Sequence, residues 1–234
     1  MKPVIHPFAD RDALEQFLCT TLETVVAGGP RSAPEFAVML SGGSTPVPAY
    51  AAVAARAPRA AAGLHILFSD ERYVPSGDPA SNYFQARPLI DALGLDEQHV
   101  LRVRTELPLT AAGEAYASAL AGLAARRIPI VIALVGLGAD GHTCSLFSKQ
   151  DLERARNADA ITVARPDGRD AITVTQRVLE RAERVVFVVS GRDKQTATKA
   201  LAALDRSQTA ACAVAGCRHV EIWGDREALA FVEG

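Results

Sequence analysis

Short apolar runs recur along the chain, and each has the length of one β-strand. Their hydrophobicity is nearly continuous rather than alternating, which is typical of strands whose two faces are both covered. These runs span residues 36–40, 64–68, 128–135, 184–189 and 219–223. We therefore expect the buried strands of a sheet that has no solvent-exposed face.

Stretches rich in alanine, leucine, arginine and glutamate separate the apolar runs and are typical of helices. Asp10 and Thr110 have side chains that can cap helix N-termini, and Pro46 suits the first turn of a helix. The expected helices span residues 10–26, 46–56, 110–125, 176–182 and 192–204. This alternation favours right-handed βαβ units. It predicts an α/β, Rossmann-like fold, a largely parallel sheet with helices on both faces.

One segment departs from this alternation. Residues 165–170 are rich in turn-forming residues, and β-like runs at 160–163 and 171–175 flank them. They predict an antiparallel hairpin or a small subdomain. Because no internal repeat and no low-complexity linker divides the sequence, we expect one domain over residues 1–234.

Composition and charge narrow the class of protein. The 234 residues include 25 Lys and Arg against 27 Asp and Glu, for a net charge of −2. Such a balance excludes a protein that binds polyanions through its overall field. We therefore expect no nucleic-acid partner, and any bound anion must be met by individually placed residues.

Membrane, secretory and zinc signals are missing from the sequence. No run reaches the ~18 apolar residues of a transmembrane helix, and the first residues lack the apolar core of a signal peptide. The four cysteines form no CxxC pair and no zinc-ligand spacing. We expect a cytoplasmic protein with reduced thiols and no membrane partner.

In open α/β sheets, ligands bind outside the carboxyl ends of the strands, so the residues that follow each apolar run are informative. After the first run, Gly42 and Gly43 allow a close approach of the backbone, and Ser44 and Thr45 follow where a helix should begin. The N–H groups of a helix start form an anion site. The loop is not a Walker A motif, because the Gly-Lys-Ser/Thr ending is missing. The alternative is a tight turn that binds nothing.

The second apolar run ends at the charged residues Asp70, Glu71 and Arg72. Adjacent charges at a strand end are often a solvated corner with surface ion pairs. Arginine, however, offers a planar fork that suits a phosphate or a developing oxyanion. Both interpretations stay open at this point.

The third apolar run leads into a glycine-rich loop that contains Asp140 and His142. Glycines allow positive φ and a tight turn, and imidazole is the natural base near neutral pH. A carboxylate two residues away could orient the ring or raise its basicity. We expect a functional histidine here, with a Cys144 nucleophile paired to His142 as an alternative.

After the fourth apolar run, Lys194 is expected in the first turn of the next helix. A cation there opposes the helix dipole unless an anion lies between them. Lys194 is therefore either an anion contact or a solvated side chain that points away.

Taken together, the segments after the strands resemble the 6-phosphogluconolactonase family. The matching pieces are residues 41–46, 69–75, 81–83, 136–143 and 145–147, with Gly191 and Lys194, and they run in the order of the family. The resemblance implies the fold shared with glucosamine-6-phosphate deaminases and ribose-5-phosphate isomerases. It implies hydrolysis of 6-phospho-glucono-1,5-lactone to 6-phosphogluconate in the oxidative pentose phosphate pathway, by a monomer that needs no cofactor or metal.

The resemblance also assigns roles to single residues. His142 matches the catalytic histidine, with Asp140 beside it to stabilise the imidazolium. Arg72 and Lys194 match cationic substrate contacts. The loop with Gly42, Gly43, Ser44 and Thr45 matches the phosphate side of the site, and Asp70 belongs to the matching segment around Arg72.

The sequence departs from the family pattern in two places. Ser148 stands where a proline usually follows Phe147, and Ala171 stands where an arginine usually precedes the Ile-Thr strand. The nearest arginine to that strand is Arg169, which we take as the replacement substrate contact.

Two other functions are carried as alternatives. An amino-sugar phosphate isomerase or deaminase needs an acid to open the sugar ring, and deaminases usually place a glutamate five residues after the loop histidine, where this chain has Phe147. A non-catalytic sugar-phosphate sensor on the same fold could lose the base, whereas this chain keeps Asp140 and His142.

Overall fold

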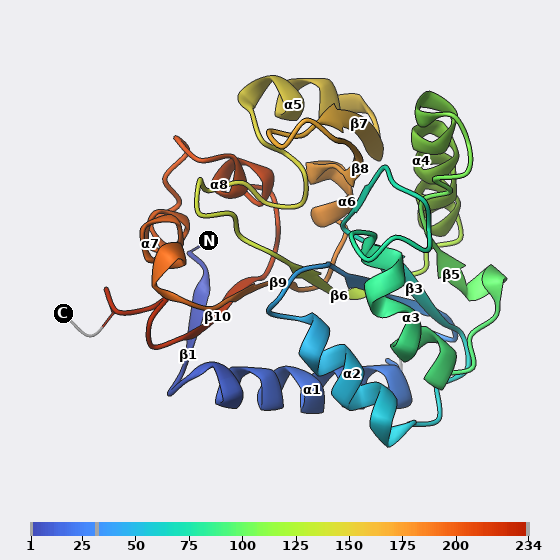
Figure 1. Ribbon diagram of the computed structural model, residues 1–234, viewed down its shortest axis with the longest axis horizontal. Helices are drawn as coiled ribbons and strands as arrows, with labels where there is room; N and C mark the ends of the chain where they lie inside the picture. Colours follow the sequence, from blue (N-terminus) through green and yellow to red (C-terminus); the bar gives the residue numbers. More distant parts are fainter. Residues whose placement is uncertain (1, 31–32, 233–234) are drawn as a thin grey trace.

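A parallel sheet of seven strands forms the centre of the protein (Figure 1). The structure is a computed structural model and describes residues 2–30 and 33–232, so both ends of the domain expected over 1–234 lie outside the described residues. The strand order is β1-β10-β9-β6-β2-β3-β5. Its strands are β1 (Val4–Phe8), β2 (Phe36–Leu40), β3 (Leu64–Phe68), β5 (Val100–Leu101), β6 (Ile130–Val135), β9 (Val185–Val189) and β10 (Val220–Asp225).

Helices cover both faces of this sheet, as the sequence predicts. In Figure 1, α1, α2 and α3 lie below the sheet, and α4 to α8 lie above it or at its sides. The helices are α1 (Arg11–Gly28), α2 (Val47–Arg56), α3 (Asn82–Ala92), α4 (Leu109–Ala125), α5 (Lys149–Arg154), α6 (Gln176–Leu179), α7 (Gln195–Ala202) and α8 (Thr209–Ala213). Short 3₁₀ helices are η1 (Glu97–His99), η2 (Ala155–Asn157) and η3 (Arg192–Lys194).

Alternate residues of each central strand supply the two layers of the core. In β2, Phe36, Val38 and Leu40 pack toward α1 and α2, whereas Ala37 and Met39 pack on the opposite side. All five residues of β2 are buried. The continuous hydrophobicity of the run is therefore explained by apolar contacts on both faces.

The sheet changes its direction of winding between β2 and β6. From β2 the chain proceeds outward through β3 to β5, and it then returns to β6 on the other side of β2. Loops that leave two such strands diverge and open a crevice at their carboxyl ends. The glycine loop after β2 and the histidine loop after β6 therefore face each other across this crevice.

A second, antiparallel sheet stands over the carboxyl edge of the first, with the order β4-β8-β7. Its strands are β4 (Asp70–Arg72), β7 (Ala160–Ala164) and β8 (Asp170–Val174). The expected hairpin between residues 160 and 175 is confirmed. The charged segment after β3 is not a loop, because Asp70, Glu71 and Arg72 pair with β8.

The helix caps follow the sequence in part. Asp10 caps α1, since its carboxylate accepts the N–H of Ala13 at 2.8 Å. Thr110 does not cap α4, because the helix begins at Leu109 after Pro108. Pro46 occupies the N-cap position of α2 and precedes its first turn.

Candidate active site

A cleft of about 280 Å³ opens at the carboxyl ends of the central strands. Its walls are the loops after β2, β6 and β9, the small antiparallel sheet and the start of α3. The lining includes Gly42, Gly43, Ser44, Thr45, Asp70, Arg72, Asn82, Gly138, His142, Cys144, Arg165, Ser190 and Lys194. Residues from four separate predicted segments thus meet in one place.

His142 and Asp140 form a hydrogen-bonded pair on the loop after β6. The Nδ1 atom of His142 lies 2.5 Å from Oδ1 of Asp140. Partial burial alone would raise the pKa of Asp140, but the hydrogen bond and the charge of His142 outweigh it and hold that pKa below its usual value. An Nδ1–H that donates to a carboxylate leaves Nε2 as the proton-accepting nitrogen of the ring.

The loop can form this pair only because residue 138 is a glycine. A Cβ on Gly138 would lie 2.1 Å from Nδ1 of His142 and 2.3 Å from Oδ1 of Asp140. The N–H of Gly138 also donates to the carbonyl of His142 at 2.8 Å and closes the turn. The glycine-rich pattern therefore has a specific structural reason at this position.

Residues at the start of α8 hydrogen-bond to the same loop. The N–H of Ala210 donates to the carbonyl of Gly141 at 3.0 Å, and the hydroxyl of Thr209 donates to the carbonyl of Leu146 at 2.7 Å. The turn around His142 is thus held at both ends by residues that are distant in sequence.

The glycine loop after β2 faces His142 from the neighbouring strand. Gly43 has a φ of 112°, a conformation that side chains rarely adopt. A Cβ on Gly42 would overlap the side chain of Asn82. Ser44 and Thr45 lie just before α2. Pro46 and Pro48 carry no N–H, and the N–H of Val47 donates to the carbonyl of Gly43 at 3.4 Å, so an anion here would be met by Ser44 and Thr45 rather than by the first turn of the helix.

Arg72 is fixed beside the glycine loop, because Asn82 contacts both. Its Nη1 donates to the carbonyl of Ala80 at 3.0 Å and to Oδ1 of Asn82. Asn82 begins α3, with Ser81 as the N-cap that accepts the N–H of Phe84 at 3.1 Å. The short motif at 81–83 therefore both starts a helix and orients an arginine.

Asp70 lines the cleft, but hydroxyl groups occupy both of its carboxylate oxygens. Ser69 donates to Oδ1 at 2.8 Å and Ser145 donates to Oδ2 at 2.6 Å. Ser145 in turn accepts a hydrogen bond from Nη1 of Arg165 at 3.3 Å. Asp70 thus lies at the centre of a network that positions other groups.

The structure places Arg165, rather than Arg169, at the cleft. Arg169 lies on the exposed β7–β8 turn and is not among the residues that line the cleft, whereas Arg165 is. The guanidinium of Arg165 lies 5.4 Å from the centroid of the Phe147 ring, and Phe147 lies 4.4 Å from the His142 ring. Arg165 is a cleft-lining cation that the sequence analysis did not name.

Lys194 lies one residue before α7, at the end of η3, and lines the cleft from the β9 side. Its Nζ atom is 3.7 Å from Oδ2 of the exposed Asp193. The side chain of Lys194 is largely covered, with 28% of its surface exposed, which favours an anion contact over a solvated side chain that points away.

The cysteine alternative is not supported by the site. Cys144 is buried, and this burial raises the pKa of its thiol well above the usual range. A reactive cysteine needs the opposite shift.

Within residues 2–30 and 33–232, no group of three or more His, Cys, Asp or Glu side chains is placed to hold a metal ion.

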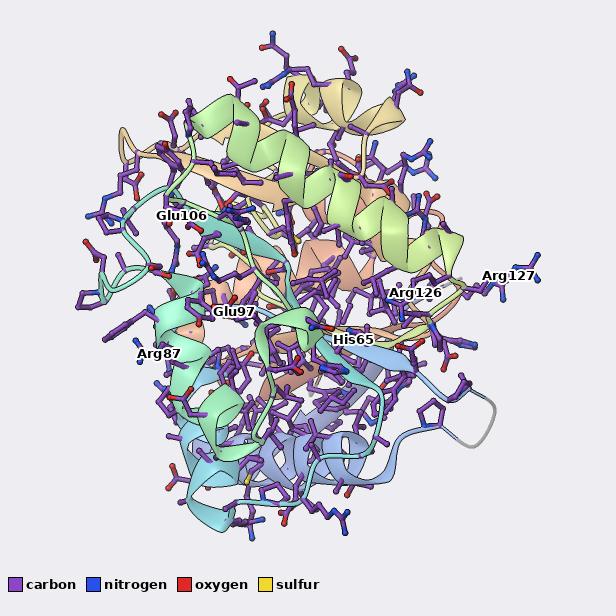
Figure 2. The ribbon with its side chains drawn as sticks, turned by 90° about the vertical axis from the view of Figure 1, so that its right-hand side faces the viewer. His65, Arg87, Glu97, Glu106, Arg126 and Arg127 are labelled. Carbon is purple, nitrogen blue, oxygen red and sulfur yellow. The ribbon has the colours of Figure 1, made fainter. Side chains whose placement is uncertain are left out.

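Three further histidines are bound to carboxylates away from the cleft. His65 lies 3.2 Å from Glu35, His99 lies 2.6 Å from Asp96, and His6 lies 3.2 Å from Glu221. Figure 2 shows His65 on the side of the molecule that α3, α4 and β5 form, with Arg126 nearby. These three histidines therefore have structural partners outside the cleft.

Comparison with known proteins identifies the family. Residues 9–223 match the family described as glucosamine-6-phosphate isomerases/6-phosphogluconolactonase, and the chain belongs to it. A 6-phosphogluconolactonase of Nostoc sp. is 32% identical over 207 residues, which cover 84% of each chain. A human 6-phosphogluconolactonase is 34% identical over 198 residues, which cover 80% of this chain and 75% of the human one.

Solved structures share the fold across almost the whole chain. The 6-phosphogluconolactonase of Trypanosoma brucei superposes with a TM-score of 0.83 at 22% identity, over 99% of both chains. A monomeric glucosamine-6-phosphate deaminase superposes with a TM-score of 0.81 at 16% identity, over 97% of this chain and 99% of the deaminase. Since both activities occur on this fold, the site has to distinguish them.

Proposed function

We propose that this protein hydrolyses 6-phospho-glucono-1,5-lactone to 6-phosphogluconate, a step of the oxidative pentose phosphate pathway. The observation that carries the proposal is the His142–Asp140 pair, 2.5 Å apart, in a cleft that also contains Lys194, Arg72 and Arg165. A base beside several cations suits an anionic substrate with a carbonyl group. The curated relatives named above bear the same activity in their names.

His142 acts as the general base. With Nδ1 turned to Asp140, its Nε2 takes a proton from water, and the water attacks the lactone carbonyl. Asp140 holds the ring in this tautomer and stabilises the imidazolium that forms. The protonated ring then gives its proton to the ring oxygen of the substrate as the C–O bond breaks.

The tetrahedral intermediate needs hydrogen-bond donors for its oxyanion. Two glycine-loop N–H groups are already engaged, since Gly43 donates to Gln85 Oε1 at 3.1 Å and Gly138 donates to the carbonyl of His142. We therefore assign the oxyanion to the guanidinium of Arg72, which has five N–H donors and so keeps others besides Nη1, the atom that Ala80 and Asn82 hold.

The phosphate binds at the start of α2, next to the glycine loop. Ser44 and Thr45 at the start of α2 supply hydroxyl and N–H donors, and Lys194 supplies a positive charge. Arg165 is a further cation within reach of a bound anion. Binding energy from this remote group orients the lactone against His142.

The deaminase alternative lacks its ring-opening acid. Phe147 takes the expected position and packs against His142 with ring centroids 4.4 Å apart. An apolar ring there can orient the imidazole, but it cannot donate or accept a proton.

Acid release from a panel of substrates tests the proposal. We expect rapid hydrolysis of freshly generated 6-phosphogluconolactone, corrected for spontaneous hydrolysis, and much slower hydrolysis of unphosphorylated gluconolactone. Equal rates on both lactones would remove the phosphate assignments, and no acceleration of either would overturn the proposal. Ammonia release from glucosamine 6-phosphate would instead support the deaminase.

We also propose that the enzyme acts as a cytoplasmic monomer without a nucleic-acid partner. All four cysteines are free thiols, which fits a reducing compartment. No helix among the described residues is long and apolar enough to span a membrane. Elution as a single chain in size-exclusion chromatography is the expected result.

A further inference from the structure

The carboxylate of Asp225 lies directly under the loop that carries Lys194. Asp225 is the last residue of β10 and is 4% exposed. Its Oδ2 accepts the hydroxyl of Ser190 at 2.5 Å and the N–H of Gly191 at 3.1 Å. Its Oδ1 accepts the N–H of Ala228 at 2.8 Å and so ties the same carboxylate to the chain that follows β10.

The parallel pairing of β9 and β10 explains this reach. Gly224 stands opposite Val189 in the register, so Asp225 lies beside the point where the chain leaves β9. A short acidic side chain at this position can cross to the next loop without strain. The contact is therefore built into the register of two buried strands.

The loop that Asp225 holds has a defined shape. Gly191 has a φ of 96°, which favours glycine, and its carbonyl accepts the N–H of Lys194 at 3.1 Å. Ser190 and Lys194 both line the cleft. Asp225 fixes one end of this turn, and the Gly191–Lys194 hydrogen bond fixes the other.

We propose that Asp225 is a positioning residue that sets the affinity for the phosphate half of the substrate by holding the turn from Ser190 to Lys194. The inference rests on the proposed function and extends it to a residue that lies outside the cleft. Asp225 contacts neither His142 nor Asp140. Its loss should therefore weaken phosphate binding and leave the chemical step nearly unchanged.

The test uses two single variants, Asp225→Asn and Ser190→Ala. An asparagine cannot accept all of these donors, because its amide nitrogen has no lone pair to offer. We expect KM for the phosphorylated lactone to rise about tenfold, as for the loss of one charged hydrogen bond, with kcat within about twofold. Hydrolysis of unphosphorylated gluconolactone should be unchanged in kcat/KM.

Two controls separate positioning from general damage. Ile222→Val removes one buried methylene from the same strand and should leave KM unchanged. If Asp225→Asn does not fold, Ser190→Ala alone removes one partner of the carboxylate and should still raise KM for the phosphorylated lactone. Equal losses on both lactones, or an unchanged KM in both variants, would overturn the inference.

Calorimetric titration with inorganic phosphate separates this inference from the proposed function. Weaker phosphate binding by Asp225→Asn than by the unaltered protein supports the positioning role, even if the unaltered protein hydrolyses no lactone. Equal phosphate binding by the two proteins contradicts it, even if the lactonase activity is found.

Discussion

Asp140 and His142 are only two residues apart, and Nδ1 of the histidine lies 2.5 Å from Oδ1 of the aspartate. The base and its orienting acid therefore belong to one turn rather than to two distant elements. This arrangement depends on the local backbone, which a Gly138 N–H and the start of α8 hold in place.

Replacing the acid should slow the reaction without removing the base. In Asp140→Asn the negative charge that stabilises the imidazolium is gone, although an amide oxygen can still accept the Nδ1–H of His142. We expect kcat to fall about tenfold to a hundredfold, measured as the initial rate of acid release at saturating substrate. An unchanged kcat would show that the two side chains do not act together.

Gly138→Ala tests the geometric requirement of the turn. The new Cβ would lie 2.1 Å from Nδ1 of His142, so the pair must separate or the loop must move. We expect kcat to fall at least about tenfold, since a small misplacement of a catalytic group is costly. Gly122→Ala in α4, where nothing lies within 4 Å of the new Cβ, should keep full activity.

Arg165 and Arg169 form a matched pair for a test of the cleft. Arg165 lines the cleft and Arg169 does not. Arg165→Ala should raise KM for the phosphorylated lactone about tenfold to a hundredfold, as for the loss of a charged hydrogen bond. Arg169→Ala should change KM by less than about twofold, and a larger effect at Arg169 would restore the expectation from the sequence.

Glu71 provides a stability test away from the substrate. It is 1% exposed, and its carboxylate accepts the N–H groups of Arg72, Asn82 and Tyr83 and the hydroxyl of Ser81. In Glu71→Gln an amide NH₂ faces some of these donors. The free energy of unfolding should fall by about 1–3 kcal/mol, measured by urea denaturation.

The same carboxylate predicts a pH dependence of stability. Burial has the largest effect on the pKa of Glu71 and raises it above the ordinary value of 4.5. The folded protein therefore binds more protons than the unfolded chain between 4.5 and the raised value, so this contribution to stability falls as the pH rises through that window. Glu71→Gln should lack this contribution, and an identical pH dependence in both proteins would contradict the assignment.

The central strands were predictable because burial on both faces demands apolar residues throughout. Residues 36–40 and 64–68 are strands as predicted. By contrast, β1 contains His6 and Pro7 at the edge of the sheet, and it has no such pattern. The charged strand β4 is buried only because distant residues such as Ser145 and Asn82 meet its polar groups.

Cleft-lining residues that directly follow strands could be named from the sequence. The choice between the two arginines of the β7–β8 turn could not. Arg165 and Arg169 stand opposite each other in the hairpin, since the N–H of Arg165 donates to the carbonyl of Arg169 at 2.8 Å. Because side chains of such a cross-strand pair point to the same face of the sheet, both arginines are expected on one face. The sequence could not decide which of the two reaches the cleft. The extent of the domain over residues 1–234 stays a prediction.

The central claim is that His142 activates water for attack on a phosphorylated lactone. The most direct test compares the initial rate of acid release from fresh 6-phosphogluconolactone by the unaltered protein and by His142→Ala. We predict that the variant loses about 10²- to 10⁴-fold in kcat while it still binds 6-phosphogluconate. Full lactonase activity in His142→Ala would contradict the account.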